Sequence, residues 1–228
     1  MAKRAPARRS GTTAGLIRLR LRGRRNASLS RDIILSAAQD EFIEHGLNGA
    51  RVDRIATAIG ASKNLIYHYF GSKDGLYLAV LEDIYRTMRV SQGDDLLYDL
   101  DPVEGMRRLV ANTFDHFART PALIRLMSIE NIHYARHLRR SKSVRKLYPS
   151  LLETIAKLLA QGQSKGVFVR DIDPVDLYIS VASLAYVYLS NQYTLSWIFR
   201  RRLAAPKRLA ARRAHVVAVI LGYLRNRS

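Results

Sequence analysis

A group of polar side chains at the start of one short segment has the residue types needed to read DNA. Ser62, Lys63 and Asn64 come first, and Tyr67 and His68 follow one helical turn later. Lysine donates to guanine, asparagine pairs with adenine, and serine can contact either base. Tyrosine and histidine offer a ring and a polar tip to base edges or phosphates. These residue types indicate DNA recognition if a helix presents them together.

Two short helices joined by a tight turn would present these side chains. Apolar spacing predicts a helix over 52–59 that stops at Gly60, and a second helix that begins at Ser62. This pair has the dimensions of a helix-turn-helix, whose second helix enters the major groove by its N-terminal end. Short helix pairs around a glycine also occur in ordinary helical cores, so the motif alone does not establish the function.

The residues around the motif form a longer pattern of glycines, apolar positions and aromatic residues. Its members are Gly46, Leu47, Val52, Ile55, Ala56, Gly60, Ser62, Ile66, Tyr67, His68, Tyr69, Phe70, Gly71, Ser72, Lys73, Leu76 and Tyr77. This pattern resembles the DNA-binding domain of the TetR family of bacterial regulators, densely over 31–80, whereas the later helices resemble the family only in number and length. The resemblance implies a homodimer that binds an operator in double-stranded DNA and has a C-terminal ligand-binding domain, and it implies repression that a small-molecule effector relieves.

The same resemblance implies which side chains touch DNA. Bases would face Ser62, Lys63, Asn64, Leu65 and Tyr67, and phosphates would meet Tyr67, His68, Tyr69 and Lys73. The family often has threonine or serine where this chain has Ala50 and Arg51, so a hydroxyl cap on the first helix of the pair is in doubt. Arg51 and Arg54 are expected to contact phosphates instead; the alternative is that they only solvate a helix face beside Asp53.

The charge balance of the chain favours a polyanionic partner. The formal net charge is +19, and residues 1–30 hold nine lysines or arginines and no acid. We interpret residues 1–29 as a disordered basic arm, although an organellar transit peptide has a similar composition. No apolar run follows that would make a secretion signal, so we expect a cytoplasmic protein. The chain has no cysteine and no recognisable catalytic motif, so we expect neither an enzyme nor a cofactor.

The apolar periodicity predicts an all-α, nine-helix, TetR-like architecture. We expect a helix-turn-helix domain over 30–75 and a ligand-binding and dimerisation domain over 76–228. The first domain would have three helices, the first running from Ser30 to Gly46. A fourth helix would run over 73–90. Cap residues followed by proline, such as Asp101 and Pro102, predict five more helices. These cover 102–119, 121–138, 144–165, 174–199 and 206–224.

The segment 177–199 has two possible functions. It contains no charged residue and is followed by three arginines, which is typical of a membrane span and would give a membrane-anchored DNA-binding protein. Its polar residues, Asn191 and Gln192 above all, would be costly in lipid, and we therefore favour a helix at a subunit interface. We expect the last helix to join it through Val216 and its apolar neighbours, while Arg212 and Arg213 stay in solvent.

Polar aromatic residues in the C-terminal part are candidates for effector binding, because buried polar groups need partners. The candidates are His116, Phe117, Asn131, Tyr134, Tyr178, Tyr186 and Gln192. Residues 130–134 and 166–176 resemble the branch of TetR-like regulators that senses pyrimidines or nicotinate-like heterocycles, which implies an aromatic or nitrogen-containing effector. Glu130, His133 and His137 have a helical spacing that could ligate a metal, but we expect no metal site, since such a set more often lines a surface or pocket.

Overall fold

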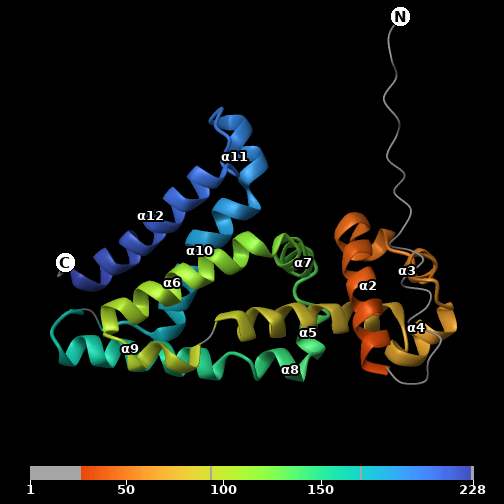
Figure 1. Cartoon of the computed structure of the whole chain (residues 1–228), viewed down its shortest axis with the longest axis horizontal. Coiled ribbons are helices and arrows are strands. Elements are labelled where there is room, and N and C mark those ends of the chain that lie inside the picture. The colour runs from red at the N-terminus through yellow and green to blue at the C-terminus, as the bar shows by residue number, and fades with distance from the viewer. Residues whose placement is uncertain (1–26, 93, 170, 227–228) are drawn as a thin grey trace, which may run out of the picture. The chain divides into compact units, whose positions relative to one another are not determined.

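The computed structural model describes residues 27–92, 94–169 and 171–226. Residues 1–26 of the expected basic arm lie outside the described residues. The described part is entirely helical apart from its turns and loops, and the chain divides into two compact units between Val80 and Leu81. The nine expected helices correspond to α2–α7, α9, α10 and α12, and Figure 1 also shows the short helices α8 and α11.

The first unit is a small domain built around three helices and the start of a fourth. Its elements are α2 (Ala27–Gly49), α3 (Val52–Ile59), α4 (Lys63–Phe70) and the beginning of α5 (Lys73–Gln92). Helix α2 therefore begins three residues before the expected Ser30. The rings of Phe42 and Tyr77 meet edge to face at 5.0 Å, and both side chains are fully buried. These contacts hold α2 against the first part of α5.

The second unit is arranged around α6 (Pro102–Arg119), which packs against α7 (Pro121–Ile132), α9 (Pro149–Ser164), α10 (Pro174–Ser190) and α12 (Pro206–Arg225). Figure 1 shows α10 and α12 approaching each other at α11 (Gln192–Ile198). Shorter elements complete the unit: η1 (Asp94–Asp99), η2 (Leu138–Arg140) and α8 (Lys142–Arg145). The carboxylates of Asp101 and Asp173 accept hydrogen bonds from the first turns of α6 and α10, as expected.

The expected helix over 174–199 is broken. Asn191 ends α10 and precedes α11, so the uncharged segment does not form one continuous helix. Among the described residues, no helix is long and apolar enough to cross a membrane. The interpretation of 177–199 as a membrane span is therefore not supported.

The last helix differs from its expected arrangement in the placement of two arginines. Val216 and its apolar neighbours are buried within their own subunit. Arg212 donates to the carbonyl oxygen of Leu184 at 3.0 Å, and Arg213 bonds both carboxylate oxygens of Asp115. These two arginines thus anchor α12 to α10 and α6, whereas we expected them to point into solvent.

Candidate nucleic-acid interface

The N-terminal end of α4 presents the residues that were expected to read bases. Ser62, Lys63 and Asn64 are exposed, as are Tyr67 and His68 one turn later. On the opposite side of the helix, a buried isoleucine at position 66 packs into the core. Helix α4 therefore has one apolar face inside the domain and one polar face in solvent.

The turn between α3 and α4 sets the direction of α4. Gly60 has a left-handed conformation (φ 65°), which glycine adopts at no steric cost. The hydroxyl oxygen of Ser62 accepts a hydrogen bond from the backbone N–H of Leu65 at 3.2 Å. Ser62 therefore caps α4, and its hydroxyl hydrogen stays available to donate to a base or phosphate.

The other expected phosphate contacts lie at the end of α4 and the start of α5. The ring of Tyr69 is half-buried and meets that of His68 edge to face at 5.8 Å. Lys73 donates from Nζ to the carbonyl oxygen of Asn48 at 3.3 Å, which ties the start of α5 to the end of α2. Leu65 is also only half-buried.

The start of α3 is capped by a carboxylate from another helix. Arg51 occupies the cap position, but its side chain makes no capping hydrogen bond. Its backbone N–H instead donates to Oε1 of Glu41 on α2 at 2.8 Å, and Nε of Arg54 donates to the same oxygen at 2.8 Å. Arg54 also donates to the carbonyl oxygen of Gly49. Glu41 thus supplies the cap that the missing hydroxyl would provide, and Arg54 is engaged within the domain.

The environment of Glu41 favours its ionised form. Burial alone would raise its pKa, but the hydrogen bonds from Arg54 and from the backbone of Arg51, with the nearby charges of Arg54 and His45, bring the pKa below its usual value. Glu41 is therefore a carboxylate at neutral pH. No local pattern in the sequence indicates this contact, because ten residues separate Glu41 from Arg51.

Asp53 joins two residues that were expected to contact DNA. Its carboxylate forms ion pairs with Lys63 at the start of α4 and with Arg51, the latter at 3.2 Å. All three side chains are exposed to solvent. Asp53 was expected only to lie beside the arginines, and its contact with Lys63 was not predicted.

Three of the seven effector candidates lie together in the second unit. Phe117 is 6.0 Å from Tyr186 and 6.5 Å from His116, measured between ring centroids. The hydroxyl groups of Tyr186 and Ser128 are 2.9 Å apart. Burial, followed by the charge of Arg119, lowers the pKa of His116, so its ring is neutral at physiological pH. The result is a partly polar aromatic cluster between α6, α7 and α10.

A second set of tyrosines includes one further candidate and two residues missed from the sequence. Tyr178 lies 5.9 Å from Tyr148, ring to ring. Burial, followed by the electrostatic influence of Tyr178, raises the pKa of Tyr85 to about 12. Burial likewise raises the pKa of Tyr148. Tyr85 and Tyr148 were missed because their positions follow the apolar periodicity of their surroundings and carry no motif.

The remaining candidates lie elsewhere. Asn131 is exposed and donates to the carbonyl oxygen of Met127, and Tyr134 is 81% exposed. Gln192 begins α11 and is half-buried. The ring contacts that define the aromatic cluster involve His116, Phe117 and Tyr186 and none of these three side chains.

The potential metal ligands make contacts of their own. Glu130 is buried and accepts hydrogen bonds from Nδ1 of His137 and from the backbone N–H groups of His137 and Leu138. The carboxylate thereby closes a loop in which Tyr134 and Ala135 both have positive φ angles. Within the described ranges, no group of three or more histidine or acidic residues is arranged to hold a metal ion.

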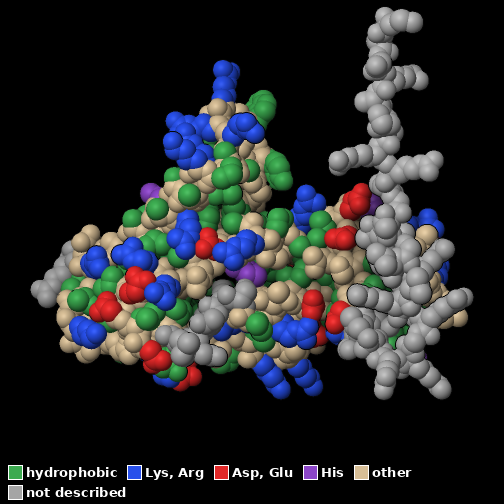
Figure 2. Space-filling model, in the orientation of Figure 1, with side chains coloured by type: hydrophobic (Ala, Val, Ile, Leu, Met, Phe, Trp, Pro, Cys, Tyr) green, Lys and Arg blue, Asp and Glu red, His purple; other side chains and the backbone are tan. Residues whose placement is uncertain are grey.

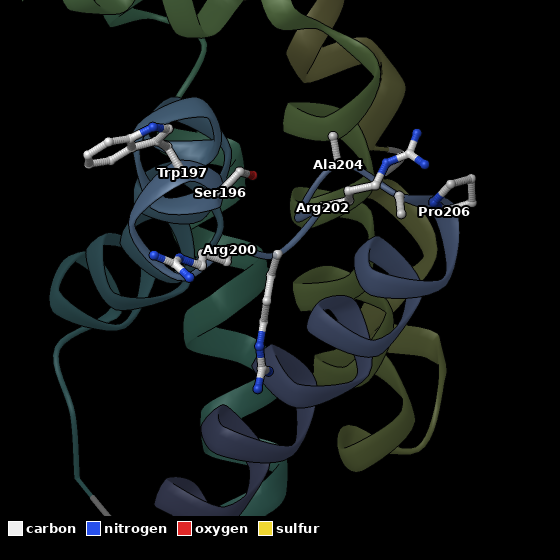
Figure 3. A pocket seen from close by; sticks show the side chains of 8 residues that line it. Ser196, Trp197, Arg200, Arg202, Ala204 and Pro206 are labelled. Atoms are coloured by element: carbon white, nitrogen blue, oxygen red, sulfur yellow. The ribbon is translucent and has the colours of Figure 1, made fainter.

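A basic surface surrounds α11 and the start of α12. Figure 2 shows lysine, arginine and hydrophobic side chains gathered there. A hollow of about 680 Å³ lies beside Trp197 and is lined by Arg200, Arg201 and Arg202. The side chains of Arg200 and Arg202 extend in opposite directions (Figure 3), so the hollow is not built around a single anion. We assign no ligand to it.

Comparison with protein-family models places known domains on both parts of the chain. Residues 34–80 match the model described as bacterial regulatory proteins, tetR family. Residues 102–220 match the model described as the tetracyclin repressor-like C-terminal domain. The first match covers α3 and α4, and the second covers α6 to α11 and most of α12.

Individual proteins give the same result. The transcriptional repressor NicS of Pseudomonas putida is 36% identical, over 75% of this chain and 80% of its own length. The repressor SCO4008 of Streptomyces coelicolor is 33% identical, over 67% of this chain and 74% of its own. Among solved structures, the putative transcriptional regulator SCO4942 of S. coelicolor has a TM-score of 0.62 at 27% identity, covering 86% of this chain and 99% of its own.

Proposed function

Because this chain belongs to the TetR family of bacterial transcriptional regulators, we propose that α4 is its operator-reading helix and that a small-molecule effector controls it from the second unit. The chain is a ligand-responsive DNA-binding regulator of the repressor type, as NicS and SCO4008 are named. The observation that carries the proposal is the exposed polar end of α4, whose other face is fixed in the core.

Operator reading would follow from the side chains of that end. Lys63 and Asn64 donate to or pair with base edges, and Ser62 can donate its free hydroxyl hydrogen. Tyr67 and His68 lie one turn further along and reach the flanking bases or phosphates. Tyr69 and Lys73 would contact the backbone from the edge of the domain, as would Arg51. Arg54, which is held by Glu41 and Gly49, would act mainly by fixing the start of α3.

A homodimer would supply two reading helices. Val175, Ile179 and Val187 form an exposed apolar row on α10, and Val219 and Tyr223 form a second row on α12. Apolar side chains in such rows are typical of a subunit interface. Two helices from each subunit would then make a four-helix interface.

The effector would be a small aromatic molecule or a nitrogen heterocycle, bound near the polar aromatic cluster. Tyr186, Phe117 and His116 supply ring faces and hydrogen-bonding groups, and Tyr178 adds a second hydroxyl beside Tyr148. Helix α5 carries Lys73 in the first unit and Tyr85 in the second. An effector that prefers one position of α5 would therefore change the affinity for DNA through this helix.

The test is operator binding by single variants of α4. Lys63→Ala and Tyr67→Ala should each weaken binding by about 1–3 kcal/mol, since that is the usual discrimination from one good base contact. Helicity and dimer formation should not change, because both side chains are exposed. Parental operator affinity in both variants, measured by fluorescence anisotropy, would refute the placement of the reading surface.

A further inference from the structure

The carboxylate of Asp53 lies on the surface that is proposed to face DNA. It is in the first turn of α3 and pairs with Lys63 of α4 across the helix-turn-helix. It also pairs with Arg51 just before α3, at 3.2 Å. One acidic side chain thus holds two of the cations that are expected to meet DNA, and it does so from both sides of α3.

A DNA phosphate would compete with Asp53 for these cations. A phosphate and a carboxylate are both anions that accept hydrogen bonds from lysine and arginine in similar geometry. An exposed ion pair and a single exposed phosphate contact contribute similarly little, so a phosphate alone does not displace the carboxylate, whereas a phosphate together with a guanine contact does. If Asp53 stays in place, the two cations remain paired with its carboxylate. They then neutralise no phosphate and release no counterions from the DNA.

We propose that Asp53 is a specificity-determining residue that withholds Lys63 and Arg51 from DNA of the wrong sequence. The inference rests on the proposed role of α4 in operator reading. On the operator, the base contacts of α4 hold the start of α3 against the DNA backbone, and their free energy offsets the loss of both ion pairs. On non-operator DNA no base contact offsets that loss, and both cations stay on Asp53. Asp53 thereby lowers non-specific affinity more than operator affinity.

The experiment compares Asp53→Asn with the parent in salt titrations on operator and on scrambled duplex DNA. Each additional phosphate contact adds about 0.9 to the slope of log affinity against log salt, or about threefold between 50 and 200 mM salt. On scrambled DNA we expect the slope of Asp53→Asn to steepen by about 0.9–1.8, for one or two released cations. On the operator the slope should not change, because the same cations already contact it.

Two controls separate this effect from general charge removal. Asp40→Asn removes the same charge from an exposed position on α2, whereas the ion pairs of Lys63 and Arg51 are with Asp53. It should leave both slopes at the parental values. In a Lys63→Ala background, Asp53→Asn should steepen the slope on scrambled DNA less than it does alone, since only Arg51 remains to be released.

Two results would overturn the proposal. The first is a slope on scrambled DNA that matches the parent or the Asp40→Asn control. The second is an equal steepening on operator and scrambled DNA, since Asp53 would then act without regard to sequence. Neither result affects the reading role of α4, which is tested separately by the operator affinities of Lys63→Ala and Tyr67→Ala.

Discussion

At the scale of single residues, the domain depends on a carboxylate in an unexpected place. A serine or threonine often caps the helix that precedes the reading helix in this family, and this chain has Arg51 there. Glu41 caps the helix instead, because its carboxylate accepts hydrogen bonds from the backbone N–H of Arg51 and from the side chain of Arg54. The two arginines at the start of α3 therefore have different roles. Arg54 stabilises the domain, while the side chain of Arg51 remains exposed beside Asp53.

Replacing Glu41 by glutamine should destabilise the protein. Hydrogen bonds to a charged group contribute about 1.5–3 kcal/mol, and Glu41→Gln should lose a comparable amount at neutral pH. The folded pKa of Glu41 is lowered, so its contribution is present above the unfolded value of 4.5 and is lost as the pH falls through the folded value. The free energies of unfolding of the parent and the variant, measured by denaturant titration, should therefore become equal in acid.

The matched control is Glu44→Gln, one turn away on the same helix. Glu44 is 76% exposed, and its ion pair with His45 is long, at 4.0 Å. This variant should unfold like the parent at every pH. An equal loss of stability in both variants would contradict the capping role of Glu41.

At the scale of elements, the sequence predicted most helix starts well and some helix ends poorly. The expected helix over 144–165 is an exception, because Lys142–Arg145 forms the separate helix α8 and α9 begins only at Pro149. Asp101 with Pro102 and Asp173 with Pro174 mark the starts of α6 and α10, because a cap and a proline act within one turn. Helix α7 ends at Ile132 rather than at 138, because the buried Glu130 binds backbone N–H groups seven and eight residues later. No glycine or proline follows Ile132 closely in the sequence, so a local sequence pattern does not predict that α7 ends there.

The same limit applies to the site. The end of α4 could be predicted because its polar residues are consecutive and follow a glycine turn. The contacts of Asp53 with Lys63 and of Glu41 with Arg51 depend on how α2, α3 and α4 pack. Such contacts join positions that are ten residues apart, and a single sequence does not specify their geometry.

The exposed row on α10 gives a prediction about assembly. Ile179→Asp should weaken the dimer strongly, because it would place a charge in an apolar interface. Val90→Asp changes an even more exposed residue of α5 and should leave the dimer intact. Sedimentation of both variants measures the difference. A parental dimer for Ile179→Asp would place the interface on another surface.

At the scale of the whole molecule, charge and symmetry determine how the protein finds and reads DNA. The net charge of +19 favours association with any duplex through counterion release. Specificity must then come from a few base contacts and from the spacing of two reading helices in a dimer. Two such helices fit successive major grooves when their centres are about 34–36 Å apart.

The most direct test of this account is a genome-wide footprint of the purified parental protein and its Lys63→Ala variant. We predict discrete, two-fold symmetric parental sites, with half-sites about 10–10.5 base pairs apart or a multiple of that distance. These sites should weaken or disappear with Lys63→Ala. Parental protein spread over DNA without sequence preference, or sites that Lys63→Ala occupies equally well, would contradict the claim that α4 reads an operator.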